Sequence, residues 1–276
     1  MFNVQLLNTS LFMKKSILNY EKFVFNIIIP YLNKNSKKLQ FIRKLNFKSK
    51  VRNQLDPVTS HDVRIQKELS KKINKNFPDH GIDGEEGSKI KKKKIINWVI
   101  DPIDGTKSFL IGMPTYSHLV GLEIDKKYKF GLAYFPVLKK YYITKKNKSY
   151  VFFNGKKRKT KTSNVKDLKK SKIVINTLRT IKNINFLNFF KKYKFFFKIT
   201  GADSYNYCKL AEGDIDIILE ANLKSFDIKP LIPIILNSGG VISDWSGRYY
   251  SGSGDILVSS NKILHNKILK ILKKIK

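Results

Sequence analysis

The sequence predicts a mixed α/β fold that forms one unit. Between about residues 95 and 146, short β-rich runs follow one another and are separated by turn residues. From about residue 172 onward, strand-like runs alternate with helical stretches. No internal repeat and no linker interrupts the 276 residues. We therefore expect a single domain, 1–276, with two lobes that cover about 1–150 and 151–276 and meet at a soft boundary near Tyr150.

The composition is that of a globular protein that needs no oxidising compartment. Hydrophobic residues make up 42% of the chain, and glycine and proline are sparse. Cys208 is the one cysteine, so no internal disulfide can form and a cytoplasmic location is expected. The apolar run 23–29 is too short to cross a bilayer, and we expect it to be the buried side of a helix rather than a membrane segment.

The net charge of +34 would ordinarily indicate nucleic acid or an anionic membrane as partner. However, only six of the 55 basic residues are arginine, and the lysines are spread along the chain, as drift in an A/T-rich genome would produce. The densest runs, 89–94, 155–161 and 267–276, are expected to be solvated loops and a helix face. We expect no specific nucleic-acid partner, and weak nonspecific binding to polyanions stays open.

The first third of the chain predicts two helices. Apolar residues recur at helical spacing between Ser10 and Lys38, and Met13 offers a second plausible translation start just before that pattern. Residues 56–78 read as a short extended entry followed by a helix with Thr59 or Asp62 as its cap. Ile65 and Leu69 mark the inward face of this helix.

The remaining elements follow in order along the chain. Residues 79–87 are expected to form a glycine-punctuated loop, and the apolar run 95–100 a buried strand. Further strands are expected at 117–124, 129–136, 140–146, 172–177, 195–200, 214–220 and 239–245. Helices are expected at 203–213 and 227–240, the latter kinked at Pro233.

The stretch "WVIDPIDGTKSF" places two acids at the carboxyl end of the buried strand. Pro102 restricts Asp101 to extended backbone, so the strand should end there, with Asp104 one turn later. Gly105 permits close approach of a ligand, and the amides of Gly105, Thr106 and Lys107 would open a helix toward an anion.

Oxygen ligands of this kind suit Mg²⁺. Asp101, Asp104 and the carbonyl of Ile103 would supply them, although an N-cap role for Asp104 and a loop role for Asp101 are equally consistent with this motif alone. Glu85 and Glu86 add a pair of acids in the preceding loop, and paired glutamates usually face solvent. The histidines lack zinc-like spacing, and the glycines form neither a P-loop nor a dinucleotide fingerprint.

Four ordered blocks together resemble the inositol monophosphatase superfamily. "WVIDPIDGTKSF" is similar to its first signature and "FDIKPLIPIILNSGGVISDW" to its second, while "DPVTSHD" and "GEEG" match two further blocks. The blocks span residues 56–245, which is most of the chain. The resemblance implies a layered αβαβα sugar-phosphatase fold and Mg²⁺-dependent hydrolysis of a small phosphate monoester.

The resemblance also implies a role for each matching residue. Two or three Mg²⁺ ions would be held by Glu85, Asp101, the Ile103 carbonyl, Asp104 and Asp227. Thr106 with Asp62 would orient and activate the attacking water. Amides of Gly105 and Thr106 would bind the phosphate, and Glu220 would face the alcohol part of the substrate. Members of this superfamily often form dimers, so a homodimer is an expectation.

Within the superfamily the chain looks most like the histidinol-phosphate phosphatases, over residues 201–235 and 104–123. Histidinol phosphate is cationic, so Glu220 and Asp203 would be sensible partners for it. Inositol monophosphatase and nucleotide 3′-phosphatase are the alternatives, and a nucleic-acid-binding protein on a degenerate phosphatase scaffold is a rival of another class. Phe226 and the pair Lys229-Pro230 depart from the usual pattern, which puts the choice of substrate in doubt.

Overall fold

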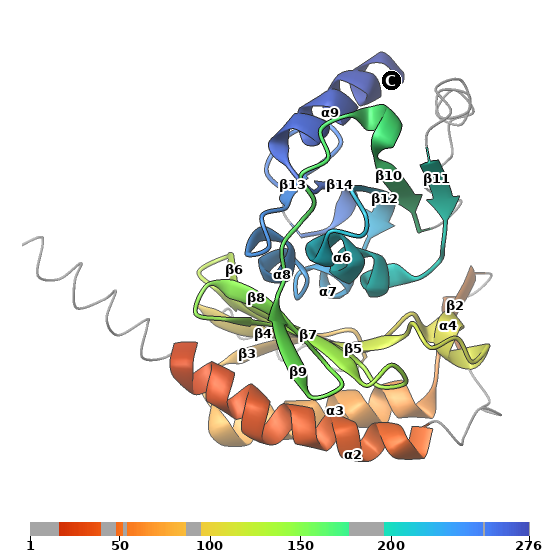
Figure 1. Cartoon of the computed structure of the whole chain (residues 1–276). Coiled ribbons are helices and arrows are strands. Elements are labelled where there is room, and N and C mark those ends of the chain that lie inside the picture. The colour runs from red at the N-terminus through yellow and green to blue at the C-terminus, as the bar shows by residue number, and fades with distance from the viewer. Residues whose placement is uncertain are drawn as a thin grey trace, which may run out of the picture.

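The computed structural model describes residues 17–39, 48–51, 54–86, 95–176, 196–250 and 252–275. Five layers, helix, sheet, helix, sheet and helix, follow one another through the molecule (Figure 1). The layered α/β prediction is therefore confirmed. The start of the predicted first helix, with Met13, and the basic run 89–94 lie outside the described residues.

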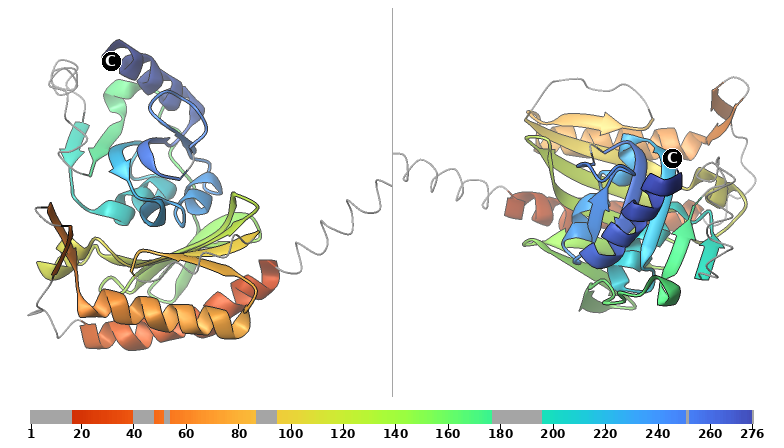
Figure 2. Two further views of the ribbon diagram at one scale, coloured as in Figure 1. Left: turned by 180° about the vertical axis from the view of Figure 1, so that it is seen from behind. Right: turned by 90° about the horizontal axis from the view of Figure 1, so that it is seen from above.

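The first layer contains two long helices that cover one face of the larger sheet (Figures 1 and 2). Residues 17–23 are helical and continue into η1 (Val24–Ile28) and α2 (Ile29–Leu39). α3 (Ser60–Asn76) is preceded by a two-stranded ribbon, β1 (Lys48–Val51) and β2 (Gln54–Val58). Of the two caps that the sequence predicted, Thr59 is the N-cap of α3, and Asp62 at the third helical position completes a capping box with it.

The larger sheet has seven strands in chain order. They are β3 (Gly81–Gly84), β4 (Ile96–Asp104), β5 (Ser117–Ile124), β6 (Lys127–Phe135), β7 (Lys140–Lys145), β8 (Lys148–Phe153) and β9 (Lys156–Lys159). β3 pairs with β4 in parallel, and each later neighbour is antiparallel. Tyr150 lies within β8, and the division of the chain into two lobes stays a prediction.

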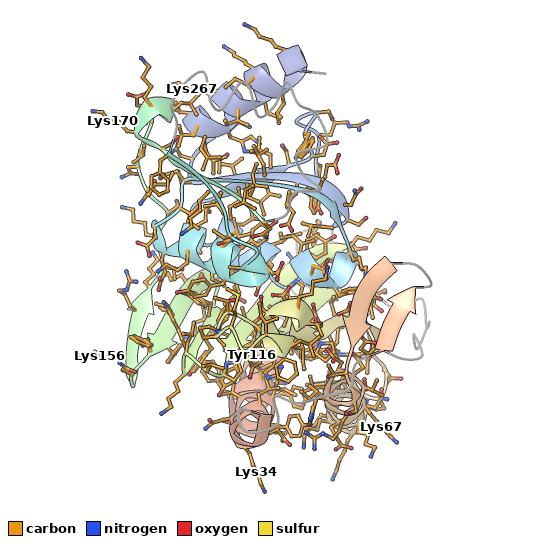
Figure 3. The ribbon with its side chains drawn as sticks, turned by 90° about the vertical axis from the view of Figure 1, so that its right-hand side faces the viewer. Lys34, Lys67, Tyr116, Lys156, Lys170 and Lys267 are labelled. Carbon is orange, nitrogen blue, oxygen red and sulfur yellow. The ribbon has the colours of Figure 1, made fainter. Side chains whose placement is uncertain are left out.

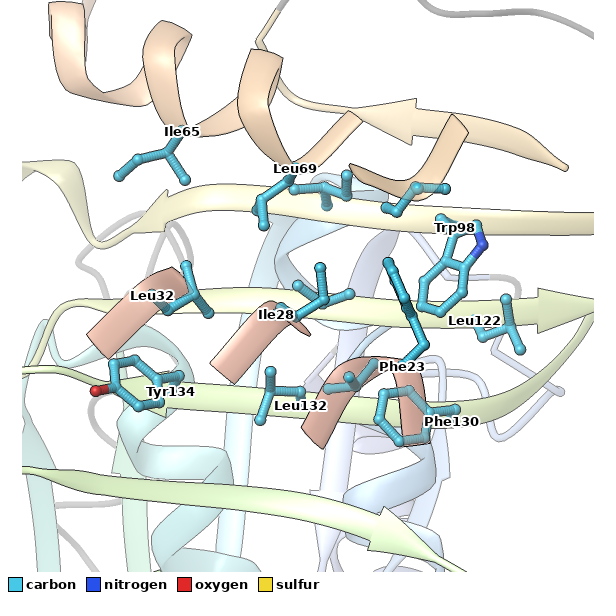
Figure 4. Close-up of a cluster of buried hydrophobic side chains, with 14 of the residues drawn as sticks. Phe23, Ile28, Leu32, Ile65, Leu69, Trp98, Leu122, Phe130, Leu132 and Tyr134 are labelled. Carbon is cyan, nitrogen blue, oxygen red and sulfur yellow. The ribbon is translucent and has the colours of Figure 1, made fainter. Parts of the chain in front are cut away.

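A hydrophobic core joins the first helices to this sheet (Figure 4). Phe23, Ile28 and Leu32 from the first helix meet Ile65 and Leu69 of α3 over the strands. Leu69 is fully buried, which confirms the inward face predicted for α3. Because this packing is periodic in both helices, it fixes how α3 lies on the sheet and where its first turn ends up.

The smaller sheet has the order β11-β10-β12-β14-β13. Its strands are β10 (Lys172–Ile175), β11 (Phe196–Ile199), β12 (Ile217–Leu223), β13 (Val241–Ser243) and β14 (Gly254–Ser259). The short helix η2 (Leu168–Lys170) precedes β10, and α9 (Lys262–Ile275) covers the outer face of this sheet (Figure 1). No helix among the described residues is both long and apolar enough to span a membrane.

The middle helical layer lies between the two sheets. It consists of α6 (Asp203–Glu212), α7 (Ser225–Ile228) and α8 (Ile232–Leu236). The kink predicted at Pro233 is wrong, because the chain breaks between α7 and α8 and Pro233 then falls in the first turn of α8, where its missing N–H costs nothing.

Two glycines of the larger sheet let the segment between α7 and α8 come very close. Gly121 and Gly131 are directly paired across β5 and β6. A Cβ atom at Gly131 would lie 1.9 Å from the carbonyl oxygen of Pro230, and one at Gly121 would lie 2.9 Å from its Cα. The two glycines therefore leave a place on the sheet without side chains, and Pro230, three residues after Asp227, packs there.

Two further expectations were wrong in detail. Residues 81–84 form strand β3 rather than part of a loop, because Ile82 is buried and the segment pairs with residues 97–100 of β4. The basic run 155–161 contains β9, an exposed edge strand of four basic residues, rather than only loop. Lysine at a sheet edge is a common protection against unwanted strand pairing.

Candidate active site

Strand β4 carries two of the predicted acids to its carboxyl end. The strand does not stop at Asp101, as we expected, but continues through Pro102 to Asp104. Its pairing with β5 shifts between these two acids, because Pro102 has no N–H to donate to the ladder. His118 of β5 donates from Nδ1 to the Pro102 carbonyl, and burial lowers the pKa of His118 to about 4. A neutral histidine thus supports the turn between the acids.

The Gly-Thr turn follows at once and opens α4 (Thr106–Leu110). Gly105 has a φ of 77°, a conformation that glycine adopts without strain. Thr106 Oγ1 donates to the Ile103 carbonyl over 3.0 Å. A Cβ atom at position 105 would lie 2.9 Å from Asp203 Oδ2, so this carboxylate lies directly against the turn.

Three predicted acids from separate elements meet in one cluster. Carboxylate oxygens of Glu85, Asp101 and Asp227 all lie within 4.8 Å of one another. Glu85 follows β3, and its backbone N–H donates to the Ile100 carbonyl over 3.1 Å. Asp227 lies in α7 and accepts from the backbone N–H of Lys224 over 3.1 Å. The parallel pairing of β3 with β4 brings Glu85 beside Asp101, and the packing of Pro230 on the glycines of β5 and β6 brings Asp227 to them.

Burial and mutual repulsion make the charged state of this cluster costly. Desolvation first, then Glu85 and Asp104, raise the pKa of Asp101 well above its usual value. Desolvation, Asp104 and Glu85 raise the pKa of Asp227 to about 8. Asp101 Oδ1 is also buried without a hydrogen-bond partner within the described part of the chain. Such a group of oxygens is suited to a hard divalent cation.

Asp104 connects this cluster to a second group of acids. Its Oδ2 accepts from the backbone N–H of Ser204 over 3.1 Å, and the pKa of Asp104 is raised by burial and by Asp203. Burial and Glu220 raise the pKa of Asp203 to about 7, although exposed Lys107 opposes that shift. The first residue of α6 and the end of β4 therefore share one acidic environment.

Glu220 of β12 is held by two donors that the sequence analysis missed. Tyr207 Oη donates to Glu220 Oε2 over 2.5 Å, and Asn176 Nδ2 donates to the same oxygen over 2.7 Å. Asn176 is held in turn by Asn206. Burial raises the pKa of Glu220 to about 7, although these two hydrogen bonds oppose the shift. The position of Asn176 just after an apolar strand was the signal available for it.

Asp62 lies in the first turn of α3 and is fully buried. Its Oδ2 accepts from Thr59 N over 2.7 Å and from Thr59 Oγ1 over 2.5 Å. Burial raises the pKa of Asp62 to about 6, and Glu86 and Glu85 add to that shift. Asp62 Oδ1 has no hydrogen-bond partner among the described residues, so one oxygen stays available. Cooperation with Thr106 on a water molecule stays a prediction.

The sequence was compared with protein families and with known proteins, and it matches one family. The profile of the Inositol monophosphatase family matches residues 28–276. A bifunctional phosphatase IMPL2 of Arabidopsis thaliana is 30% identical over 79% of this chain and 66% of its own length. Human inositol monophosphatase 1 is 30% identical over 78% of this chain and 81% of its own length.

Two further relatives extend these matches. A histidinol-phosphatase of Chlorobaculum parvum is 26% identical over 77% of this chain and 82% of its own length. The solved structure of an IMPase from Thermotoga maritima superposes with a TM-score of 0.75 at 25% identity, covering 90% of this chain and 97% of the other. The chain therefore belongs to the inositol monophosphatase family and is a phosphatase of that family.

Proposed function

We propose that this phosphatase hydrolyses histidinol phosphate, a step of histidine biosynthesis, with bound Mg²⁺. The observation that carries the proposal is the second group of acids, Asp203 and Glu220, beside the metal-binding candidates. Histidinol phosphate has a protonated amine and an imidazole, and buried carboxylates stabilise such cations. Inositol phosphate offers only hydroxyl groups to the same positions.

The metal site is proposed on the residues predicted for it. Glu85, Asp101 and Asp227 fit a hard cation, because their carboxylate oxygens converge. Asp104 is added to them because burial and the neighbouring acids raise its pKa, as they raise those of Asp101 and Asp227. With the Ile103 carbonyl they would hold two or three Mg²⁺ ions. When bound, the ions lower the pKa of water and neutralise the leaving oxygen of the substrate.

The chain's own groups would handle the proton and the phosphate. With a pKa of about 6, Asp62 can accept a proton from water near neutral pH, and Thr106 would orient that water. The backbone N–H groups of Gly105, Thr106 and Lys107 would bind the phosphate at the turn. The Oε2 atom of Glu220 already accepts two hydrogen bonds, which fix the carboxylate, and its other oxygen would face the substrate alcohol.

Inositol 1-phosphate is the second candidate, since a relative named inositol monophosphatase is 30% identical and carboxylates accept hydrogen bonds from hydroxyls. A nucleotide 3′-phosphate is the third. A nucleic-acid-binding role is less well supported, because exposed Lys34, Lys67, Lys156, Lys170 and Lys267 lie on different elements around the molecule (Figure 3). The acids that a degenerate phosphatase would have lost are also present.

A substrate panel with Mg²⁺ tests the proposal. Phosphate release is compared for histidinol phosphate, inositol 1-phosphate and adenosine 3′,5′-bisphosphate. We expect kcat/KM for histidinol phosphate to exceed the others by about tenfold or more, the effect of one well-placed ionic contact. Equal low rates on all three, or a preference for inositol 1-phosphate, would contradict the assignment.

Charge-neutral variants sharpen the test. Glu220→Gln and Asp203→Asn should reduce kcat/KM for histidinol phosphate more than for inositol 1-phosphate, because only the first substrate is cationic. Glu68→Gln is the matched control, since Glu68 is a surface acid paired with Lys71 on α3. A uniform loss across substrates would mean that these acids act in the common chemistry instead of in selection.

Two predictions about context accompany the proposal. The reducing cytoplasm stays the proposed compartment, because the chain has one cysteine and Cys208 is free and buried. A homodimer also stays a prediction, which sedimentation can check.

A further inference from the structure

A lysine side chain lies at the edge of the acidic cluster. Lys224 is the residue before α7, and its ammonium nitrogen is 3.8 Å from Glu85 Oε1. The same ammonium lies 5.7 Å from the centre of the Phe226 ring. The side chain is 47% exposed while that of Glu85 is only 10% exposed, so the charge reaches inward from the surface.

The backbone and the side chain of Lys224 contact different acids. The backbone N–H donates to Asp227 Oδ2 over 3.1 Å and helps to fix that acid. The ammonium instead neutralises part of the charge of Glu85, and it also lowers the pKa of Asp227. Replacement of the Lys224 side chain by an uncharged one therefore removes the cation from the cluster and leaves the backbone hydrogen bond to Asp227 in place.

An ammonium and a divalent cation at one carboxylate oppose each other. Glu85 carries one negative charge, and like charges held a few ångströms apart repel each other strongly. A cation that binds at Glu85 must either displace the Lys224 side chain or accept its repulsion. The exposed position of Lys224 allows displacement, because a flexible lysine side chain can turn toward solvent.

We propose that Lys224 is a tethered cation that competes with the divalent metal ion for Glu85, so that it weakens metal binding and stabilises the metal-free site. Without this ammonium, Glu85 repels Asp101 and Asp227 more strongly, and the metal-free cluster is less stable. The proposal rests on the proposed metal site but not on the identity of the substrate.

Direct metal titration tests the competition without measuring turnover. Mn²⁺ is titrated into metal-free protein and the free ion is followed by its electron paramagnetic resonance signal, for wild type and for Lys224→Gln. We expect the variant to bind Mn²⁺ about threefold to tenfold more tightly, the range for loss of one partly exposed charge. The metal-free variant should also unfold at a lower temperature than metal-free wild type.

Two controls separate local competition from general charge. Lys67→Gln removes the same charge from the exposed face of α3 and should leave the dissociation constant unchanged (Figure 3). Lys224→Arg keeps the cation and should bind Mn²⁺ as wild type does. A thermal melt of each variant, Lys224→Gln included, shows whether it is folded at the temperature of the titration, so an unfolded protein would not be mistaken for a binding effect.

The outcomes are distinguishable from a failure of the metal site itself. If wild type binds no Mn²⁺, the proposed metal site is wrong. If wild type binds and Lys224→Gln has the same dissociation constant, or a weaker one, competition by Lys224 is overturned. An unchanged metal affinity together with a raised KM would show that the lysine contacts the phosphate of the substrate instead.

Discussion

Asp104 joins the two groups of acids, and its substitution separates chemistry from folding. It accepts from Ser204 N and shares its surroundings with Asp203, and its ionised form is disfavoured by burial. Asp104→Asn keeps the shape of the side chain and an acceptor for Ser204 but removes the charge of a proposed metal ligand. We expect turnover to fall by about three orders of magnitude or more, because several kcal/mol of transition-state stabilisation depend on the bound cations.

The measurement for Asp104→Asn is phosphate release beside a thermal melt followed by circular dichroism. Asp125→Asn serves as the control, since Asp125 lies in a turn with a φ of 49° that asparagine also adopts readily. A folded Asp104→Asn protein with a near-normal rate would rule out the metal assignment.

At the scale of single residues, the sequence predicted the acids of the candidate site but not the residues that contact them. Asp101, Asp104 and Glu85 stand in recognisable local motifs, so the resemblance placed them without knowledge of the fold. Asn176 and Lys224 carry no local motif, because their roles depend on which strand ends meet in space. Asn176 and Glu220 are 44 positions apart in the sequence, and Lys224 and Glu85 are 139 positions apart. Only the tertiary fold brings these residues into contact.

Among the elements, β4 and α3 were predictable because each has a long apolar pattern of its own. β3 was not, since four residues with glycine at both ends become a strand only by pairing with β4. The exposed, wholly basic β9 has the composition of a loop and is held by its pairing with β8. Short elements fixed by their neighbours are those that local patterns miss.

The contact between β6 and Pro230 links sheet packing to the position of Asp227. Gly131→Ala would place a methyl group against the Pro230 carbonyl, so the α7–α8 segment or the strand must move. We expect a loss of about 1 to 3 kcal/mol in the free energy of unfolding, as in other overpacked sites. Weaker Mg²⁺ binding should accompany it, because Asp227 moves with that segment.

Urea unfolding with and without Mg²⁺ measures both effects of Gly131→Ala. Gly155→Asn is the comparison, since nothing lies within 4 Å of a Cβ atom there and asparagine tolerates its φ of 72°. Wild-type stability and metal affinity in Gly131→Ala would show that the close approach is not needed to place Asp227.

The contact of α9 with the smaller sheet predicts a pH dependence. His265 lies between Ser243 and Ser259, with ring-to-hydroxyl distances of 2.9 and 3.2 Å, and burial lowers its pKa from 6.5 to about 4. The unfolded chain therefore binds the proton more readily between these values. Stability from this residue is fully present above pH 6.5 and is lost as pH falls toward 4, by up to about 1.4 kcal/mol per pH unit.

His265→Asn tests this linkage, because asparagine can hydrogen-bond the serines and does not titrate. Chemical unfolding at several pH values should give a shallower loss of stability between pH 6.5 and 4 than wild type shows. Parallel pH profiles for the two proteins would contradict the role of His265, while His118 contributes equally to both and cancels in the difference.

For the molecule as a whole, an acidic centre lies inside a chain of net charge +34. The lysines of Figure 3 lie outside on several elements, whereas the acids converge where the larger sheet meets the middle helices. Residues from β4, α6, β12 and α7, together with Glu85 just after β3, supply this centre, so both sheets must be in place to form it. In the absence of metal, repulsion among these acids therefore lowers the stability of the folded state.

This repulsion predicts that metal binding stabilises the folded state. Mg²⁺ at a hundred times its dissociation constant should add about 2.7 kcal/mol to the free energy of unfolding, because it binds the folded state only. Asp101→Asn should melt at a higher temperature than wild type without metal, since the raised pKa of Asp101 means that its ionised form destabilises the fold at neutral pH. The same variant should gain little on addition of Mg²⁺.

Differential scanning calorimetry of protein treated with a chelator and then supplied with Mg²⁺ measures both changes. Asp125→Asn should respond to the metal as wild type does, which separates the site from general screening of charge by salt. If Asp101→Asn were less stable than wild type in the absence of metal, the buried carboxylate would be stabilising the fold, and repulsion among the acids would not be the reason that metal binding favours it.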